Sequence, residues 1–182
     1  PCHRRVHRPE RDEPERGLVG TRRGKATQLD LLPPAPDPES ACRSQGIVLL
    51  AGVDEVGRGP LAGPVVAAAV ILPGEARFPG LTDSKLLAPA RREYFDHLVR
   101  EQALTYAVAE VDVAGIEQLG ILQASLRAMA LAVQQLKPPP EFILVDGPWR
   151  LPLDTPQQPV IKGDRRCLVI AAASVLAKVH RD

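Results

Sequence analysis

The sequence predicts an α/β fold, a mixed sheet of about five strands with helices on both faces. From Gly46 onward, short apolar runs of strand length alternate with longer stretches whose apolar residues recur every three or four positions. The first two strands are separated only by a turn rich in glycine and proline, whereas the later strands alternate with helices. Hydrophobic residues make up 45% of the chain and aromatic residues 3%, so the core must consist of Ala, Val, Leu and Ile.

The predicted strands are short. The first is an apolar run that indicates a buried strand, the second has β-branched residues at its ends, and the third alternates between apolar and polar residues. In chain order the strands are Ile47–Val53, Pro64–Leu72, Thr105–Val111, Phe142–Val145 and Gln158–Ile161.

Three segments are predicted as helices. The middle one, Ile121–Leu136, has its apolar residues at helical spacing and ends before the prolines at 138–140, which cannot continue a helix. The other two are Ala88–Glu101 and the alanine-rich Leu168–His180.

Residues 1–45 differ from the rest in composition. They hold many prolines and mix arginines with acidic residues without apolar periodicity, so we predict a disordered tail before a folded domain at 46–182. The tail is either a solvated extension without function or a weak nucleic-acid contact through Arg4, Arg5, Arg22, Arg23 and Lys25. Because the chain begins at Pro1 and ends inside a predicted helix, we expect it to be a fragment.

Charge and cysteine content narrow the class of protein. The formal net charge is +1, so binding to nucleic acid would have to depend on a local basic patch. The longest apolar runs, Val65–Leu72 and Leu168–Ala177, fall short of the ~18 residues that span a bilayer. Three cysteines without metal-ligand spacing are typical of reduced thiols. We therefore expect a cytoplasmic monomer that does not contact a membrane.

Carboxylates gather at the predicted ends of strands. Asp54 and Glu55 close the first strand, Asp146 closes the fourth, and Asp164 precedes the last helix. Clustered carboxylates repel each other unless a cation neutralises them, and hard divalent ions prefer oxygen ligands. Adjacent strand residues point to opposite faces, so Asp54 and Glu55 can share one site only at a strand end or bulge. Taken alone, the pair is equally typical of a solvated strand edge.

The turn Gly57-Arg58-Gly59 allows two interpretations. It superficially matches a dinucleotide-binding loop, which would make the chain an oxidoreductase, but such a loop must open into a helix and here a strand follows. In a nuclease, the glycines would allow close backbone approach and Arg58 would bind a backbone phosphate. The triplet Asp83-Ser84-Lys85 is either a phosphate-binding loop or an ordinary helix cap.

Together these segments resemble the ribonuclease HII family. The matching blocks are Gly52–Gly63, Asp83-Ser84-Lys85, Val145-Asp146-Gly147, Lys162-Gly163-Asp164, Ile170–Val179 and Arg181-Asp182. They occur in the family's order and spacing over roughly residues 46–182. The sister family, ribonuclease HIII, typically has lysine at the position of Arg58 and is the second choice.

The resemblance implies a ribonuclease H-like fold and hydrolysis of the RNA strand in RNA–DNA hybrids. Members cut on the 5′ side of a ribonucleotide embedded in duplex DNA, leave 3′-hydroxyl and 5′-phosphate ends, and remove ribonucleotides and RNA primers. It also implies two divalent ions, Mg²⁺ or Mn²⁺, as cofactors. The residues carried over as metal ligands and catalytic residues are Asp54, Glu55, Asp146 and Asp164, and those for substrate binding are Gly57, Arg58, Gly59, Ser84 and Lys85.

Two further expectations accompany the resemblance. Family members continue past the Arg181-Asp182 pair, so we expect the C-terminal part of the domain to be missing here, including a tyrosine that stacks at the ribose junction. The alternative from another class is a catalytically inactive nucleic-acid-binding module of the same fold. Retention of the carboxylates favours the enzyme, because binding alone does not need a negative pocket facing phosphates.

Overall fold

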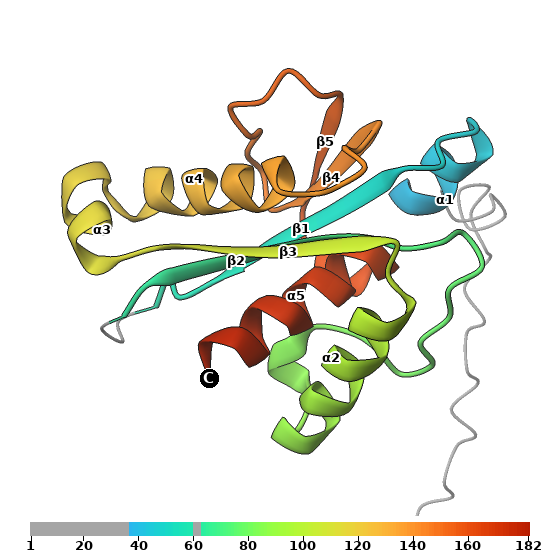
Figure 1. Ribbon diagram of the computed structural model, residues 1–182, viewed down its shortest axis with the longest axis horizontal. Helices are drawn as coiled ribbons and strands as arrows, with labels where there is room; N and C mark the ends of the chain where they lie inside the picture. The colour runs from blue at the N-terminus through green and yellow to red at the C-terminus, as the bar shows by residue number, and fades with distance from the viewer. Residues whose placement is uncertain (1–36, 60–62) are drawn as a thin grey trace, which may run out of the picture. The chain divides into compact units, whose positions relative to one another are not determined.

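A five-stranded mixed sheet forms the centre of the molecule (Figure 1). The computed structural model describes residues 37–59 and 63–182, so the predicted tail up to residue 36 lies outside the described residues. The strand order is β3-β2-β1-β4-β5. The strands are β1 Leu50–Val56, β2 Val65–Ile71, β3 Thr105–Val111, β4 Phe142–Asp146 and β5 Gln157–Val160.

The sheet is antiparallel on one side of β1 and parallel on the other. β1 pairs antiparallel with β2, and β2 with β3, whereas β4 runs parallel to β1 and β5 parallel to β4. The β1–β4 ladder ends at Val53 opposite Val145, but β1 stays paired with β2 as far as Val56 opposite Val66. The last three residues of β1 therefore extend past the end of the parallel pairing.

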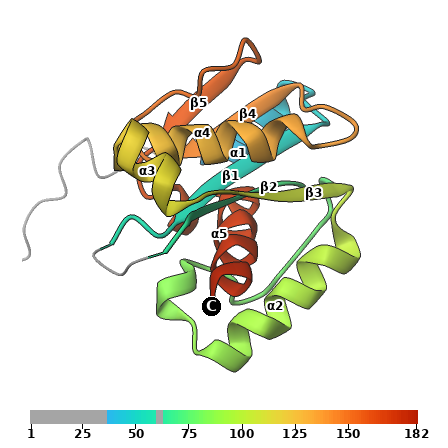
Figure 2. The same cartoon turned by 60° about the vertical axis from the view of Figure 1, so that its left-hand side comes forward.

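Helices cover both faces of the sheet, which confirms the predicted fold class (Figures 1 and 2). On one face, α4 (Ile121–Gln134) packs its apolar side on Ala51 and Val53 of β1 and their neighbours. On the other face, α5 (Leu168–Arg181) packs on Leu50 and on alternate residues of β2, with α2 (Pro89–Gln102) beside it. The alternation of β1 residues between the two cores follows from the two-residue period of a strand.

Gly52 explains how closely α5 approaches the sheet. A Cβ atom at this position would lie 2.2 Å from the carbonyl carbon of Val169, at the start of α5. The contact is with backbone, which cannot move aside as a flexible side chain can. Glycine at this point of β1 therefore lets the first turn of α5 rest directly on the strand.

One prediction for the tail is wrong where the structure describes it. Residues 38–44, expected to be disordered, form the helix α1 (Pro38–Ser44). Asp37 caps it by accepting from the backbone amide of Ser40 at 2.9 Å, and Pro38 supplies a fixed backbone angle for the first turn. Cys42 packs into the core beneath α5.

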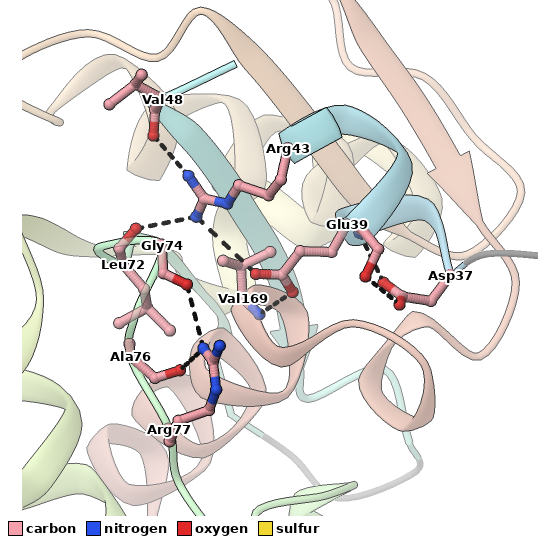
Figure 3. A network of polar contacts seen from close by, with 10 residues as sticks. Asp37, Glu39, Arg43, Val48, Leu72, Gly74, Ala76, Arg77 and Val169 are labelled. Atoms are coloured by element: carbon pink, nitrogen blue, oxygen red, sulfur yellow. Dashed lines mark hydrogen bonds and ion pairs between the residues drawn. The ribbon is translucent and has the colours of Figure 1, made fainter. Parts of the chain in front are cut away.

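Hydrogen bonds connect α1 to residues of the domain that are distant in sequence (Figure 3). Glu39 accepts from the backbone amide of Val169 at 3.1 Å, which satisfies a free donor in the first turn of α5. Arg43 donates to the carbonyl oxygens of Val48 at 2.7 Å and Leu72 at 3.0 Å. Such long-range contacts leave no periodic signal in sequence, which is why composition alone predicted disorder here.

Other elements differ in smaller ways. The first strand was predicted at Ile47–Val53 but runs three residues later, so Asp54 and Glu55 lie inside β1 rather than after it. The helix α3 (Val113–Leu119), capped by Asp112, was not predicted. Two short 3-10 helices of the described residues, η2 (Ser84–Leu86) and η3 (Gly163–Arg165), are joined by the contact between Asp83 and Arg165. Within the described residues, no helix has the length and apolar character to cross a membrane.

Candidate active site

The carboxylates lie where the two central parallel strands end. Asp54 is one residue past the last β1–β4 pair and Asp146 is the last residue of β4, so they occupy adjacent strands at the same level. Leu50 and Leu144 belong to the core beneath α5. Asp54 and Asp146 are an even number of residues away from them in the same strands, so both side chains are on the face of the sheet that α5 covers. The predicted meeting of these two side chains at one end of the sheet is consistent with this register.

Glu55 joins them although it neighbours Asp54 in the strand. Glu55 and Asp146 line the same pocket of about 650 Å³, where β1 extends past the end of β4. The predicted strand end is not where the structure has it: Glu55 is still paired with β2, and it reaches the pocket because the pairing of β1 with β4 has already ended. The other charged side chains of this pocket are basic: Arg58, Lys85, Lys178 and Arg181.

Asp54 is the most strongly perturbed of these acids. Burial, followed by the charges of Glu55 and Asp146, raises the pKa of Asp54 well above its usual range. The Glu55 amide, which donates to Asp54 Oδ1 at 2.7 Å, and the nearby Ser174 hydroxyl oppose that rise. The side chain is only 6% exposed, so solvent does little to neutralise its charge.

Asp146 and Asp164 are linked through η3. The Gly163 amide donates to Asp146 Oδ1 at 2.7 Å, and Asp164 follows in the chain. Burial raises the pKa of Asp146, opposed in part by that hydrogen bond and raised further by Glu55. Burial and then the charge of Asp146 raise the pKa of Asp164. The carboxyl groups of Asp54, Asp146 and Asp164 are therefore each held near another acid that disfavours their ionised form.

The triplet Asp83-Ser84-Lys85 touches the site at three points. Asp83 accepts from Arg165, the neighbour of Asp164, at 3.0 Å. Lys85 lines the pocket, and its charge opposes part of the rise in the pKa of Asp146 and of Asp164 that burial causes. Ser84 is 3% exposed and its hydroxyl lies 2.9 Å from that of Ser174, so it does not face solvent as a phosphate ligand would.

The two glycines of the Gly57-Arg58-Gly59 turn have different surroundings. Gly57 has a φ of +107°, and a Cβ there would lie 2.6 Å from the Pro64 carbonyl oxygen and 3.1 Å from the Arg181 side chain. Gly59 has open space around the position of a Cβ. The first glycine is therefore required by the fold itself, whereas the second leaves room for something outside the chain. Arg58 donates to Glu55 at 3.1 Å, so its guanidinium reaches the carboxylates.

The donor set fits a hard divalent cation in chemistry, although not as a closed cage. Among residues 37–59 and 63–182, no three His, Cys, Asp or Glu side chains converge tightly enough to hold an ion by themselves. Asp54, Glu55 and Asp146 nevertheless provide only oxygen ligands, and their mutual repulsion is what a bound cation relieves.

Three side chains of α5 lie toward the site and were not predicted from the sequence. Ser174, Lys178 and Arg181 are spaced four and three residues apart, which places them on one face of the helix toward the site. That spacing was visible in the predicted helix and could have marked them. Lys178 and Arg181 add positive charge to the pocket, and the Ser174 hydroxyl lies 2.9 Å from that of Ser84.

A loop between β4 and β5 carries the residues that follow Asp146. Trp149 lies three positions after it and is 49% exposed, so its indole does not pack in the core. Buried Gln157 holds the loop by accepting from the Leu151 amide at 2.7 Å and donating to the Leu153 carbonyl oxygen at 2.9 Å. This loop therefore starts at the carboxylate site and is fixed at its far end.

Known proteins resemble the chain in sequence and in fold. The family model for ribonuclease HII matches residues 51–182. A ribonuclease HII of a Geobacillus strain is 50% identical over 76% of this chain and 50% of its own length, and that of Geotalea uraniireducens is 50% identical over 79% and 67%. The structure of ribonuclease H2 from Pyrococcus horikoshii aligns with a TM-score of 0.65 and 28% identity, over 73% of this chain and 72% of that one. The chain thus spans about half the length of the Geobacillus relative and about two thirds of that from Geotalea.

Proposed function

The chain belongs to the ribonuclease HII family, and from this premise we propose that it is a metal-dependent endonuclease acting on RNA–DNA hybrids. Its substrate is the RNA strand of a hybrid or a single ribonucleotide embedded in duplex DNA. The cut falls on the 5′ side of the ribonucleotide and leaves 3′-hydroxyl and 5′-phosphate ends. The observation that carries this proposal is that Glu55 and Asp146 line a pocket whose other charged residues are basic, with the buried Asp54 close enough to both for their charges to raise its pKa.

Asp54, Glu55, Asp146 and Asp164 would hold two Mg²⁺ or Mn²⁺ ions. Bound there, the metal would supply an activated water and stabilise charge on the leaving oxygen of a phosphodiester. The carboxylates repel each other without it, so the pocket holds a cluster of acidic groups whose repulsion a bound cation would relieve. A module that only bound nucleic acid would gain nothing from such a pocket, which is why the inactive alternative is the weaker one.

The basic residues of the pocket would bind the nucleic-acid backbone. Arg58, Lys85, Lys178 and Arg181 surround the carboxylates and supply charge-assisted hydrogen bonds to phosphates. Arg58 also reaches Glu55, so one guanidinium can restrain both a carboxylate and a phosphate. The backbone at Gly57–Gly59 would approach the ribose 2′-hydroxyl, the group that distinguishes RNA from DNA.

Cellular roles in ribonucleotide removal and RNA primer removal follow from that activity. Cytoplasmic location and a monomeric state remain predictions. The dinucleotide-binding alternative loses its support, because the strand β2 rather than a helix follows the glycine turn.

The test is cleavage of a duplex that carries one ribonucleotide, with Mn²⁺ and with excess EDTA. We expect a cut on the 5′ side of the ribonucleotide with Mn²⁺, no cut in EDTA, and no cut of the all-DNA duplex. Cleavage that persists in EDTA would contradict metal dependence. Binding of the duplex without any cleavage in Mn²⁺ would instead favour the inactive module.

A further inference from the structure

An ion pair joins the two 3-10 helices beside the carboxylates. Arg165 of η3 donates to Asp83 Oδ2 at 3.0 Å, across 82 positions of the chain. Asp83 lies directly before η2, and its other oxygen accepts from the backbone amide of Lys85 at 2.9 Å. Asp83 is 3% exposed, whereas the side chain of Arg165 is 50% exposed. One buried carboxylate therefore holds both helices.

The contact with Asp83 fixes η3 on one side of Asp164, and a second contact fixes it on the other. The Gly163 amide donates to Asp146 Oδ1 at 2.7 Å. The turn also packs closely on α5, since a Cβ atom at Gly163 would lie 2.4 Å from the Ile170 Cδ1 atom. The residues directly before and after Asp164 are thus tied to two separate segments, β4 and the start of η2. A shift of η3 away from η2 would therefore move Asp164.

We infer that Asp83 and Arg165 are positioning residues that hold Asp164 where it can bind a divalent cation together with Asp146. This inference rests on the proposed function, because it concerns Asp164 as a metal ligand. Neither Asp83 nor Arg165 needs to touch the ion: Arg165 holds η3, and Asp83 holds Arg165. Groups that orient metal ligands commonly change metal affinity by about 10–100-fold when they are removed.

The charge of Arg165 makes the inference testable by the sign of an effect. A guanidinium near the site repels a divalent cation, so its removal would by charge alone strengthen Mn²⁺ binding. Loss of the contact that holds η3 would weaken Mn²⁺ binding instead. Because the side chain of Arg165 is half-exposed, the ion pair should contribute little to the free energy of unfolding, and variants of Arg165 should fold.

The experiment measures Mn²⁺ binding to the whole chain by titration calorimetry, without substrate. Arg165→Ala should weaken Mn²⁺ binding about tenfold, at the low end of the range for such groups, because Gly163 still holds η3 to Asp146. The double variant of Asp83→Asn with Arg165→Ala keeps the net charge of the chain. It should bind Mn²⁺ as weakly as Arg165→Ala does, since the two side chains act through one contact.

Arg166→Ala provides the matched control. Arg166 is the next residue, is exposed, and reaches only the limit of a hydrogen bond to the Ile161 carbonyl oxygen, at 3.5 Å. Its replacement removes the same charge from the same turn and leaves the contact with Asp83 intact. The Mn²⁺ affinity of Arg166→Ala should equal or slightly exceed that of the wild type. Circular dichroism in EDTA checks that each variant folds. If Arg165→Ala does not fold, the double variant carries the test, because it leaves no unpaired charge at residue 83.

Three results would overturn the inference. The first is a Mn²⁺ affinity in folded Arg165→Ala that equals or exceeds the wild-type value. The second is an equal loss of affinity in Arg166→Ala, which would show that the effect does not depend on the contact with Asp83. The third is wild-type affinity in the double variant, which would assign the loss to the unpaired charge of Asp83.

Failure of the proposed function would give a different result. A wild-type chain that binds Mn²⁺ without cleaving any duplex would contradict the endonuclease activity alone, because calorimetry reports on the metal ligands independently of cleavage.

Discussion

Replacing Asp54 with asparagine should stabilise the protein in EDTA while abolishing metal-dependent cleavage. The carboxyl group is buried beside two other acids, and its folded-state pKa is raised well above the ordinary value of 3.8. A raised pKa means that folding disfavours the charged form. The contribution of Asp54 to stability is therefore present below pH ~3.9 and is lost as the pH rises through the folded-state pKa.

The size of the effect follows from the strand geometry. Neighbouring strands lie ~4.8 Å apart, so the carboxylates of Asp54 and Asp146 are about 6 Å apart if both face α5. Two unit charges at that distance repel by roughly 3 kcal/mol at an effective dielectric constant of about 20. Asparagine removes this repulsion and keeps an oxygen for the Glu55 amide. We expect Asp54→Asn to gain about 2–3 kcal/mol near neutral pH in EDTA, a rise of about 4–12 °C in Tm.

The assay is thermal unfolding of both proteins from about pH 4 to 8, with EDTA and with Mn²⁺. In EDTA the Tm of Asp54→Asn should exceed that of the wild type by an amount that grows with pH. In Mn²⁺ this difference in Tm should shrink or reverse, because the bound ion stabilises the wild type. Cleavage should fall by several factors of ten, each about 1.4 kcal/mol of barrier. Asp154→Asn, which changes an exposed carboxylate in the β4–β5 loop, should alter none of these values. A Tm for Asp54→Asn below that of the wild type in EDTA at every pH would refute the reasoning.

Other variants test the glycines and the N-terminal helix. Gly57→Ala should lose about 1–3 kcal/mol of stability in urea unfolding, because of its positive φ and the contact with backbone. Gly59→Ala should stay within about 0.5 kcal/mol of wild type yet cut the single-ribonucleotide duplex more slowly, and normal cleavage would exclude a sensor role. Gly52→Ala should lower the free energy of unfolding by at least about 1–3 kcal/mol, since α5 must move away from β1. An unchanged urea midpoint would contradict the close approach of α5 to Gly52. Glu39→Ala should lower stability by about 0.5–2 kcal/mol by freeing the Val169 amide, and an unchanged Tm would show that α1 does not support α5.

The sequence predicted the elements whose signal is local. The bounds of β3 were predicted as observed, because its apolar alternation ends at both bounds. The prediction for β1 was three residues early, since the apolar run Ile47–Leu49 precedes the point where sheet pairing begins. Pairing partners, which determine that point, are far away in the chain.

Long-range contacts explain what could not be predicted. The helix α1 is polar and short, and its link to α5 comes from Glu39, whose partner lies 130 residues further along the chain. The carboxylates were predicted from their place at strand ends, and the register of β1 and β4 is consistent with their meeting. The inward orientation of Ser84 was not predicted, since a motif specifies residue types and not the direction of a side chain.

The loop after β4 gives the protein an optical signal of its own. Trp149 is the single tryptophan of the chain and lies half-exposed three residues from Asp146. Its fluorescence can be excited apart from that of the two tyrosines, so the emission reports on one place in the molecule. A paramagnetic ion such as Mn²⁺ quenches a nearby indole, and a stacked base would quench it as well. Events at the carboxylates can therefore be followed in real time without attaching a dye.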